Sequence, residues 1–223
     1  MTVGPGERTR RRIVEAAERL FAERGLAAVS LREIAAAAGQ RNTSAAAYHF
    51  GSRAGLIDAI FELRMEPINR RRLEMLAAHR GREPGLRHLV EALVYPLAES
   101  LGTREHPTWY LRFIEETFRD PDTGPFDLGG RAVTEGLRAV IDGMTTQLAD
   151  LPDVVRAERI ALAVELVVHA LARREARAQS ARLDPHASTA LVAANLVDAA
   201  LAVLRAPMSS ATRDELTAAP RSA

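Results

Sequence analysis

A short stretch of polar side chains, Arg41, Asn42, Thr43 and Ser44, lies between two alanine-rich segments. Arginine reads guanine and asparagine reads adenine through paired hydrogen bonds, whereas serine and threonine contact any base. We therefore expect these four residues to lie at base edges. The Ala45-Ala46-Ala47 run that follows would give a slim surface able to enter a DNA groove closely.

Tyr48 and His49 come directly after the alanines. A phenol hydroxyl and an imidazole can both donate to a phosphate oxygen, which fixes position rather than sequence. The residues from 41 to 49 thus combine side chains that can recognise nucleic-acid bases with side chains that can bind a phosphate backbone.

Four arginines near the N-terminus, Arg8, Arg10, Arg11 and Arg12, could also meet phosphates from a flexible arm. The alternative is a solvated helix start. The whole chain has 30 Arg and Lys against 29 Asp and Glu, a net charge of +1. Divided at residue 64, the first part holds 10 Arg and 7 acidic residues and the second 20 and 22. The near-neutral total therefore combines a basic N-terminal part with an acidic remainder.

Other chemistries have little support in the 223 residues. Cysteine is absent, none of the six histidines forms an H-x-x-x-H or H-E-x-x-H pair, and no nucleophile-elbow or phosphate-loop motif occurs. We expect no enzyme, no metal and no cofactor. No signal-peptide run and no stretch of about 18 apolar residues occurs, so we expect a cytoplasmic protein without a membrane partner.

Helix signals divide the N-terminal part into short elements. Apolar spacing predicts a helix from Glu7 to Arg24, ended by Gly25. Ser30 and Glu33 form a capping box for a second short helix, which Gly39 ends. A third runs over 43–50, and Ser52 can cap a fourth. Two short helices joined by a glycine turn make a helix-turn-helix, whose second helix can enter a major groove.

Longer helices punctuated by Pro and Gly follow, and no strand pattern appears, so we expect an all-α fold. Pro67 predicts a separate or bent piece over 65–79, and 80–85 is a linker. Further helices are expected over 86–101 (kinked by Pro96), 107–119, 125–149, 153–180 and 185–205. The predicted domains are 1–64 for nucleic-acid binding, 65–205 for the remaining helices, and 206–223 as a loose tail.

The segment from Arg10 to Leu63 contains I-V-E-A-A-E-R-L-F-A-E-R-G, then S-L-R-E-I-A-A-A-A-G, then A-Y-H-F-G-S-R-A-G-L-I. This pattern resembles the TetR (tetracycline-repressor-like) family of bacterial transcription regulators over about the first 64 residues. The resemblance implies operator DNA as a partner, with Tyr48, His49 and Arg53 at phosphates. It also implies a C-terminal domain that binds a small-molecule effector and forms a homodimer.

Two positions depart from the usual family pattern. The interval from Gly39 to Phe50 is one residue longer, which shifts the base-reading register, and Gly55 stands where an acidic capping partner for Ser52 is common. A subgroup with R-N-x-S-A-x-x-Y-H-F-G-S is similar to this sequence and carries the same insertion.

The middle of the chain concentrates aromatic residues, and its end contains two broadly apolar helices. The first feature suits an apolar effector pocket or a plain core. The pocket residues we expect are Met75, Tyr95, Trp109, Tyr110, Phe113, Met144 and His169; the last of these, on an apolar stripe, also fits a core histidine. The second feature suits a dimer seam or an intramolecular core. The seam residues we expect are Leu166, Leu191, Val197 and Leu201.

Together these features predict a repressor that an apolar effector releases from its operator. The alternatives are a helical protein-interaction module and an activator without a small-molecule ligand. A plain interaction module would leave the N-terminal arginines and the Tyr48-His49 pair unexplained.

Overall fold

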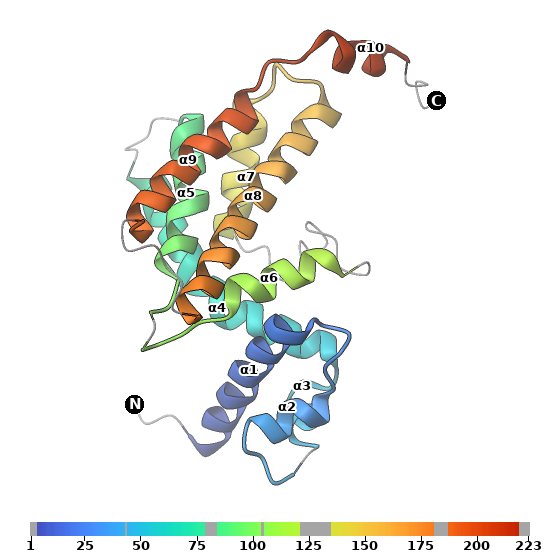
Figure 1. Cartoon of the computed structure of the whole chain (residues 1–223), viewed down its shortest axis with the longest axis vertical. Helices are drawn as coiled ribbons and strands as arrows, with labels where there is room; N and C mark the ends of the chain where they lie inside the picture. Colours follow the sequence, from blue (N-terminus) through green and yellow to red (C-terminus); the bar gives the residue numbers. More distant parts are fainter. Residues whose placement is uncertain are drawn as a thin grey trace.

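The computed structural model describes residues 4–42, 44–78, 84–103, 105–120, 135–180 and 187–218 (Figure 1). Every regular element in these ranges is an α-helix, which confirms the all-α class. Three N-terminal helices lie at one end of the molecule and the last helix lies at the other (Figure 1).

The N-terminal helices are α1 (Pro5–Arg24), α2 (Leu31–Ala37) and α3 (Ala45–Phe50). α1 begins two residues earlier than predicted, because Pro5 has the backbone geometry of a first helical turn. The Arg8 to Arg12 cluster therefore lies on a helix rather than in a flexible arm. The capping box of α2 is confirmed: Ser30 Oγ accepts from the Glu33 N–H, and Glu33 accepts from the Ser30 N–H at 2.9 Å.

A small apolar core holds these helices together. α1 contributes Ile13, Ala17 and Phe21, all fully buried, and Ile34 of α2 packs among them. Ala46 of α3 is also fully buried, which lets α3 lie close against its neighbours. The helix-turn-helix is thus a packed unit.

α4 (Arg53–Ala77) is a single helix of 25 residues with Pro67 inside it, so of the two alternatives predicted from Pro67, a separate piece or a bent one, the separate piece is wrong. A proline removes one backbone donor, and burial along α4 outweighs that loss. Ser52 caps α4 as predicted, with its Oγ accepting from the Gly55 N–H at 3.1 Å. α4 crosses residue 64 and joins the N-terminal helices to the rest of the chain (Figure 1).

The body is a bundle of α5 (Leu86–Glu99), α7 (Glu135–Gln147), α8 (Asp153–Gln179) and α9 (Thr189–Arg205). Two predicted helices begin later than expected: the one over 107–119 is α6 (Tyr110–Arg119), and the one over 185–205 begins at Thr189. The described part of the helix predicted over 125–149 is α7. Positions 125–134 and 185–186 lie outside the described residues.

α6 packs against both α1 and α8, between the N-terminal helices and the bundle (Figure 1). At the opposite end, α10 (Ser210–Ala218) forms a helix within the predicted loose tail, so the tail prediction is wrong over those residues. No single described helix is long and apolar enough to cross a membrane; α9 and α10 pass that test only as a pair bent by 52°.

Candidate DNA interface and effector clefts

The turn between α2 and α3 presents an exposed polar edge. Gly39 has a φ of +71°, a left-handed conformation that lets the chain leave α2 sharply. Arg41, Asn42 and Ser44 are all exposed beyond it, while Thr43 lies outside the described residues. The structure thus brings the described members of the predicted base-reading set to one surface.

Asn42 also has a local role. Its Oδ1 accepts from the Ser44 N–H at 3.0 Å, and its backbone carbonyl accepts from the Ala45 N–H at 3.1 Å. This is an Asx turn, in which a side chain replaces a backbone acceptor. Asn42 therefore shapes the entry to α3, and any contact with a base must share its carbonyl oxygen.

α3 has one buried and one exposed side. Ala45 and Ala46 are buried, so the expectation that all three alanines approach a groove is wrong for these two; Ala47 is exposed. Tyr48 is 86% exposed, the most exposed of the large apolar side chains that the structure describes. Its ring lies 5.3 Å from the half-buried His49 ring in an edge-on arrangement. A phenol held in solvent on a short helix is well placed to meet a backbone phosphate.

The four arginines of α1 differ in how free they are. Arg11 pairs with Glu15 at 2.9 Å, and Arg10 lies over the Phe50 ring at 5.3 Å with Glu62 at 3.6 Å. Arg8 and Arg12 are exposed and have no ion pair with any described residue. Within the cluster, Arg8 and Arg12 are therefore the free cations, and Arg10 helps to hold α3 against α1.

Arg53, for which the resemblance implies a phosphate contact, donates from Nη2 to the Val29 carbonyl at 3.1 Å. It thereby ties the start of α4 to the loop before α2. Its side chain is exposed, so the remaining guanidinium donors face solvent.

The presence of glycine at position 55 has a steric explanation. A Cβ at this position would lie 2.3 Å from the Phe50 carbonyl oxygen, so the acidic residue common in the family could not fit here. α4 thus begins directly against the end of α3.

Arg32 was missed by sequence reasoning. It is exposed on α2 and forms no ion pair with a described residue. Its place just after the capping serine, outside the apolar spacing of α2, could have indicated a solvent-facing cation.

α6 is bonded to the helices on both sides of it. Glu18 of α1 accepts from the Trp109 N–H at 3.3 Å and from Arg64 of α4 at 2.6 Å. Glu175 of α8 accepts from the N–H groups of Leu111 (3.4 Å) and Arg112 (3.0 Å). The first turn of α6 is therefore capped by carboxylates from two other helices.

Arg112 adds a second bridge, donating to the Ala22 carbonyl of α1 at 3.0 Å and to Gln179 of α8 at 2.9 Å. Burial raises the pKa of Glu175 to about 7, although its hydrogen bonds from Arg112, Thr108 and Leu111 favour the ionised form. A displacement of α6 would thus move α1 and α8 together.

The predicted pocket residues do not gather around one cavity that the structure describes. Tyr110, Phe113 and Met144 are buried in the core, and Met75, Tyr95 and Trp109 are half-buried against it. His169 is exposed on α8, 2.5 Å from Glu115, so the expectation of a core histidine is wrong, although His169 does line two open clefts on that surface. The spacing of apolar residues predicts the apolar stripe of α8, but it does not show that His169 lies at the edge of this stripe that faces solvent.

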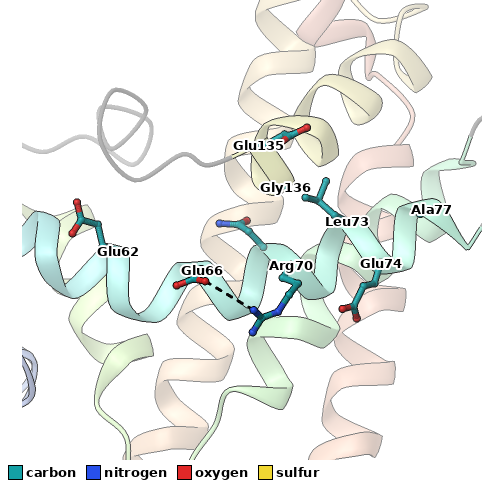
Figure 2. A pocket seen from close by; sticks show the side chains of 9 residues that line it. Glu62, Glu66, Arg70, Leu73, Glu74, Ala77, Glu135 and Gly136 are labelled. Carbon is teal, nitrogen blue, oxygen red and sulfur yellow. Dashed lines mark ion pairs between the residues drawn. The ribbon is translucent and has the colours of Figure 1, made fainter. Parts of the chain in front are cut away.

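Several clefts are nevertheless open in the described residues. One of about 760 Å³ lies between α4 and α7, with Asn69, Leu73, Ala77 and Gly136 in its wall and glutamates around it (Figure 2). Another of about 320 Å³ lies where α4, α5 and α6 meet, and Tyr110 forms part of its wall. In the described part of the chain, no three His, Asp or Glu side chains gather as a metal site.

The predicted seam residues separate into two groups. Val197 is 0% exposed and Leu201 is buried, so both belong to the core of the chain, and their assignment to a surface seam is wrong. Leu191 is 58% exposed and Leu166 is half-buried. Leu162, which the sequence did not single out, is 51% exposed on α8.

Comparison with known proteins gives a family for the N-terminal part. Residues 13–60 match the family described as bacterial regulatory proteins, tetR family. A search of curated proteins found no match.

Two similar solved structures come from Streptomyces coelicolor. A TetR-family regulator from strain A3 is 24% identical, covering 92% of this chain and 99% of that one, with a TM-score of 0.34. A TetR-family transcriptional regulator is 20% identical, covering 89% and 95%, with a TM-score of 0.37. The matched residues run from α1 into α4 and include the whole helix-turn-helix. The N-terminal helices of this chain are therefore similar to the bacterial regulatory proteins of the tetR family.

Proposed function

We propose that this chain is a homodimeric repressor of transcription that leaves its operator when a small effector binds in the helical body. The observation that carries the proposal is the tetR-family helix-turn-helix, whose outer edge presents Arg41, Asn42 and Tyr48 to solvent. The repressor role, the dimer, the effector and the similarity to the R-N-x-S-A-x-x-Y-H-F-G-S subgroup are parts of this proposal.

DNA contact would combine two kinds of group. Exposed cations at Arg8, Arg12 and Arg32 would neutralise phosphates, and Tyr48 would donate to one. The residues of the α2–α3 turn would reach base edges.

A dimer would set the spacing of two such helices. Half-sites on DNA repeat about one helical turn apart, roughly 34–36 Å, so a two-fold arrangement lets both copies of α3 bind at once. The exposed apolar side chains Leu162 and Leu191, with Leu166 beside them, offer a surface on α8 and α9 for a second copy.

Effector control would act through α6. Since α6 is bonded to α1 at one side and to α8 at the other, a ligand that moves the body would also move α1. An effector with higher affinity for a wrongly spaced conformer shifts the population away from DNA binding.

The experiment is fluorescence anisotropy with DNA that flanks the gene for this protein. We expect tight binding that weakens steeply with salt, and a smaller salt slope for Arg12→Ala, because one phosphate contact is lost. Arg205→Ala is the matched control, since this exposed arginine at the end of α9 also lacks an ion pair in the described residues.

Binding that does not depend on salt, or equal effects of the two substitutions, would contradict the proposed interface. A reporter gene behind the bound DNA then separates repression from activation. Rising expression on deletion of the regulator supports repression, whereas falling expression indicates an activator.

A further inference from the structure

Arg72 of α4 is buried inside the body with 1% of its surface exposed, and it forms no ion pair with a described residue. Its Nη1 donates to Asn69 Oδ1 at 2.8 Å, but its Nε finds no acceptor. Burial lowers the pKa of Arg72 to about 10, so the guanidinium still carries its charge at pH 7. An isolated charge in this position is costly.

Two neighbouring side chains also have an unused polar atom. The Asn69 Nδ2 and the Tyr110 hydroxyl are both buried without a hydrogen-bond partner. Tyr110 is buried in the same interior, with a neutral hydroxyl because burial raises its pKa, and Asn69 lies one turn from Arg72 on α4. All three can donate a proton to an acceptor, so what this cluster requires is a group that accepts.

Among the described residues, the other two buried charged side chains, Glu18 and Glu175, both have hydrogen-bond partners, which sets Arg72 apart. Glu18 receives two bonds from Arg64, at 2.6 and 3.1 Å. Glu175 receives bonds from Thr108, Leu111 and Arg112. Buried charged groups without a full set of hydrogen-bond partners are therefore not general among the described residues of this interior.

We propose that Arg72, Asn69 and Tyr110 bind the carboxylate of an amphipathic organic acid. A guanidinium edge and a carboxylate match in shape and can share two hydrogen bonds. The rings of Phe61 and Phe113 lie 6.3 Å from the Tyr110 ring and suit an apolar body attached to that carboxylate. This site would hold the effector, so its regulatory role rests on the proposed function above.

Two clefts border this cluster, while Arg72 itself lines neither of them. Asn69 lies in the wall of the α4–α7 cleft and Tyr110 in the wall of the cleft at α4, α5 and α6 (Figure 2). Around the α4–α7 cleft, Glu66 pairs with Arg70, and the Glu62 and Glu66 side chains are more than half exposed. Their negative charge disfavours an anion at the mouth, so the attraction of a carboxylate to the Arg72 guanidinium must outweigh this repulsion.

The test uses octanoate and phenylacetate, each beside the alcohol and the amine of the same carbon skeleton. Thermal unfolding and isothermal titration calorimetry are measured on the full chain. We expect both carboxylates to raise Tm and to bind at least ten times more tightly than their alcohols and amines. Arg72→Met should abolish this preference, and Tyr110→Phe should weaken carboxylate binding several-fold.

Arg205→Met is the matched control, since Arg205 is exposed at the end of α9 and lines neither cleft. It should keep the preference for carboxylates. The unliganded Arg72→Met variant should unfold at the same or a higher temperature than the wild type, because an unpaired buried charge is replaced by an apolar chain of similar length.

A strong loss of Tm in unliganded Arg72→Met would overturn the proposal, because it would mean that the guanidinium already has a stabilising partner. Equal binding of acid, alcohol and amine would overturn it as well. Carboxylate binding that leaves DNA affinity unchanged would support the site but contradict effector control. Loss of DNA binding in every variant would contradict the proposed function and leave the carboxylate result standing.

Discussion

At the scale of single residues, side chains near α3 have both structural and binding roles. Asn42 accepts from the Ser44 N–H, and Arg53 donates to Val29, while both remain exposed. Substituting either therefore changes local folding and DNA contact together, so variants that separate the two effects are needed.

Asn42 offers such a pair. Asn42→Asp keeps an acceptor for the Ser44 N–H but adds negative charge, so we expect unchanged stability and a loss of DNA binding of at least tenfold. Asn42→Ala removes the acceptor, and we expect it to lower the free energy of unfolding by about 1 kcal/mol. Urea denaturation measures the free energy of unfolding, and fluorescence anisotropy measures DNA binding. A lower free energy of unfolding in Asn42→Asp than in the wild type would count against the Asx turn.

Glu175 gives a pH dependence. Its pKa rises from an ordinary 4.5 to about 7 in the folded chain, so the folded state binds this proton more tightly. The resulting stability is complete below about pH 4.5 and is lost as pH rises through 7, a difference of roughly 3 kcal/mol at most.

Glu175→Gln should remove this contribution, so that the difference in unfolding free energy between variant and wild type changes between pH 5 and pH 8. Chemical denaturation at a series of pH values measures it. Parallel curves for the two proteins would show that Glu175 does not titrate in this range.

At the scale of elements, close approach between helices decides which residues are allowed. α4 starts so near the end of α3 that a Cβ on Gly55 would meet the Phe50 carbonyl oxygen. The structure therefore explains a departure from the family pattern that the sequence alone left as an oddity.

Gly55→Ala should destabilise the protein by about 1–3 kcal/mol, because the new methyl group forces α3 and α4 apart. Gly6→Ala is the control, since no atom lies within 4 Å of its Cβ and alanine favours a helix. Thermal melts of both variants measure the effect; equal melting temperatures would refute the clash.

Sequence predicted the elements whose signals are local. The Ser30 and Glu33 box and the Ser52 cap use residues three apart, so both could be recognised from spacing. The cap of α6 by Glu175 could not be recognised in this way, because the Glu175 carboxylate lies more than 60 residues along the chain from the N–H groups that donate to it.

Side-chain direction was harder to predict than helix position. Val197 and Leu201 lie on a helix that is apolar on most of its sides, so composition did not show which side faces the core. The prediction for Ala45 and Ala46 was wrong for a related reason: a small alanine side chain suits both a packed contact between helices and a close approach to a DNA groove.

At the scale of the whole molecule, assembly should depend on the outer sides of α8 and α9. Leu162→Glu and Leu191→Glu together should give monomers in sedimentation velocity while leaving the helical content unchanged. The same monomers should bind operator DNA at least tenfold more weakly, because a single α3 then contacts one half-site.

Val197→Glu is the contrasting variant. It places a charge in the core, so we expect unfolding rather than a folded monomer. A folded, monomeric Val197→Glu protein would instead return the seam to the residues first predicted from the sequence.

The two carboxylates that cap α6 are made at different times during synthesis of the chain. α6 has 10 residues, too few for a stable isolated helix in water. Its first turn is completed by Glu18, made earlier, and by Glu175, made much later. A nascent chain that stops before residue 175 therefore holds its DNA-binding helices without the junction that connects them to the body. In the proposed function, coupling between the body and the DNA-binding helices would therefore arise only after α8 has left the ribosome.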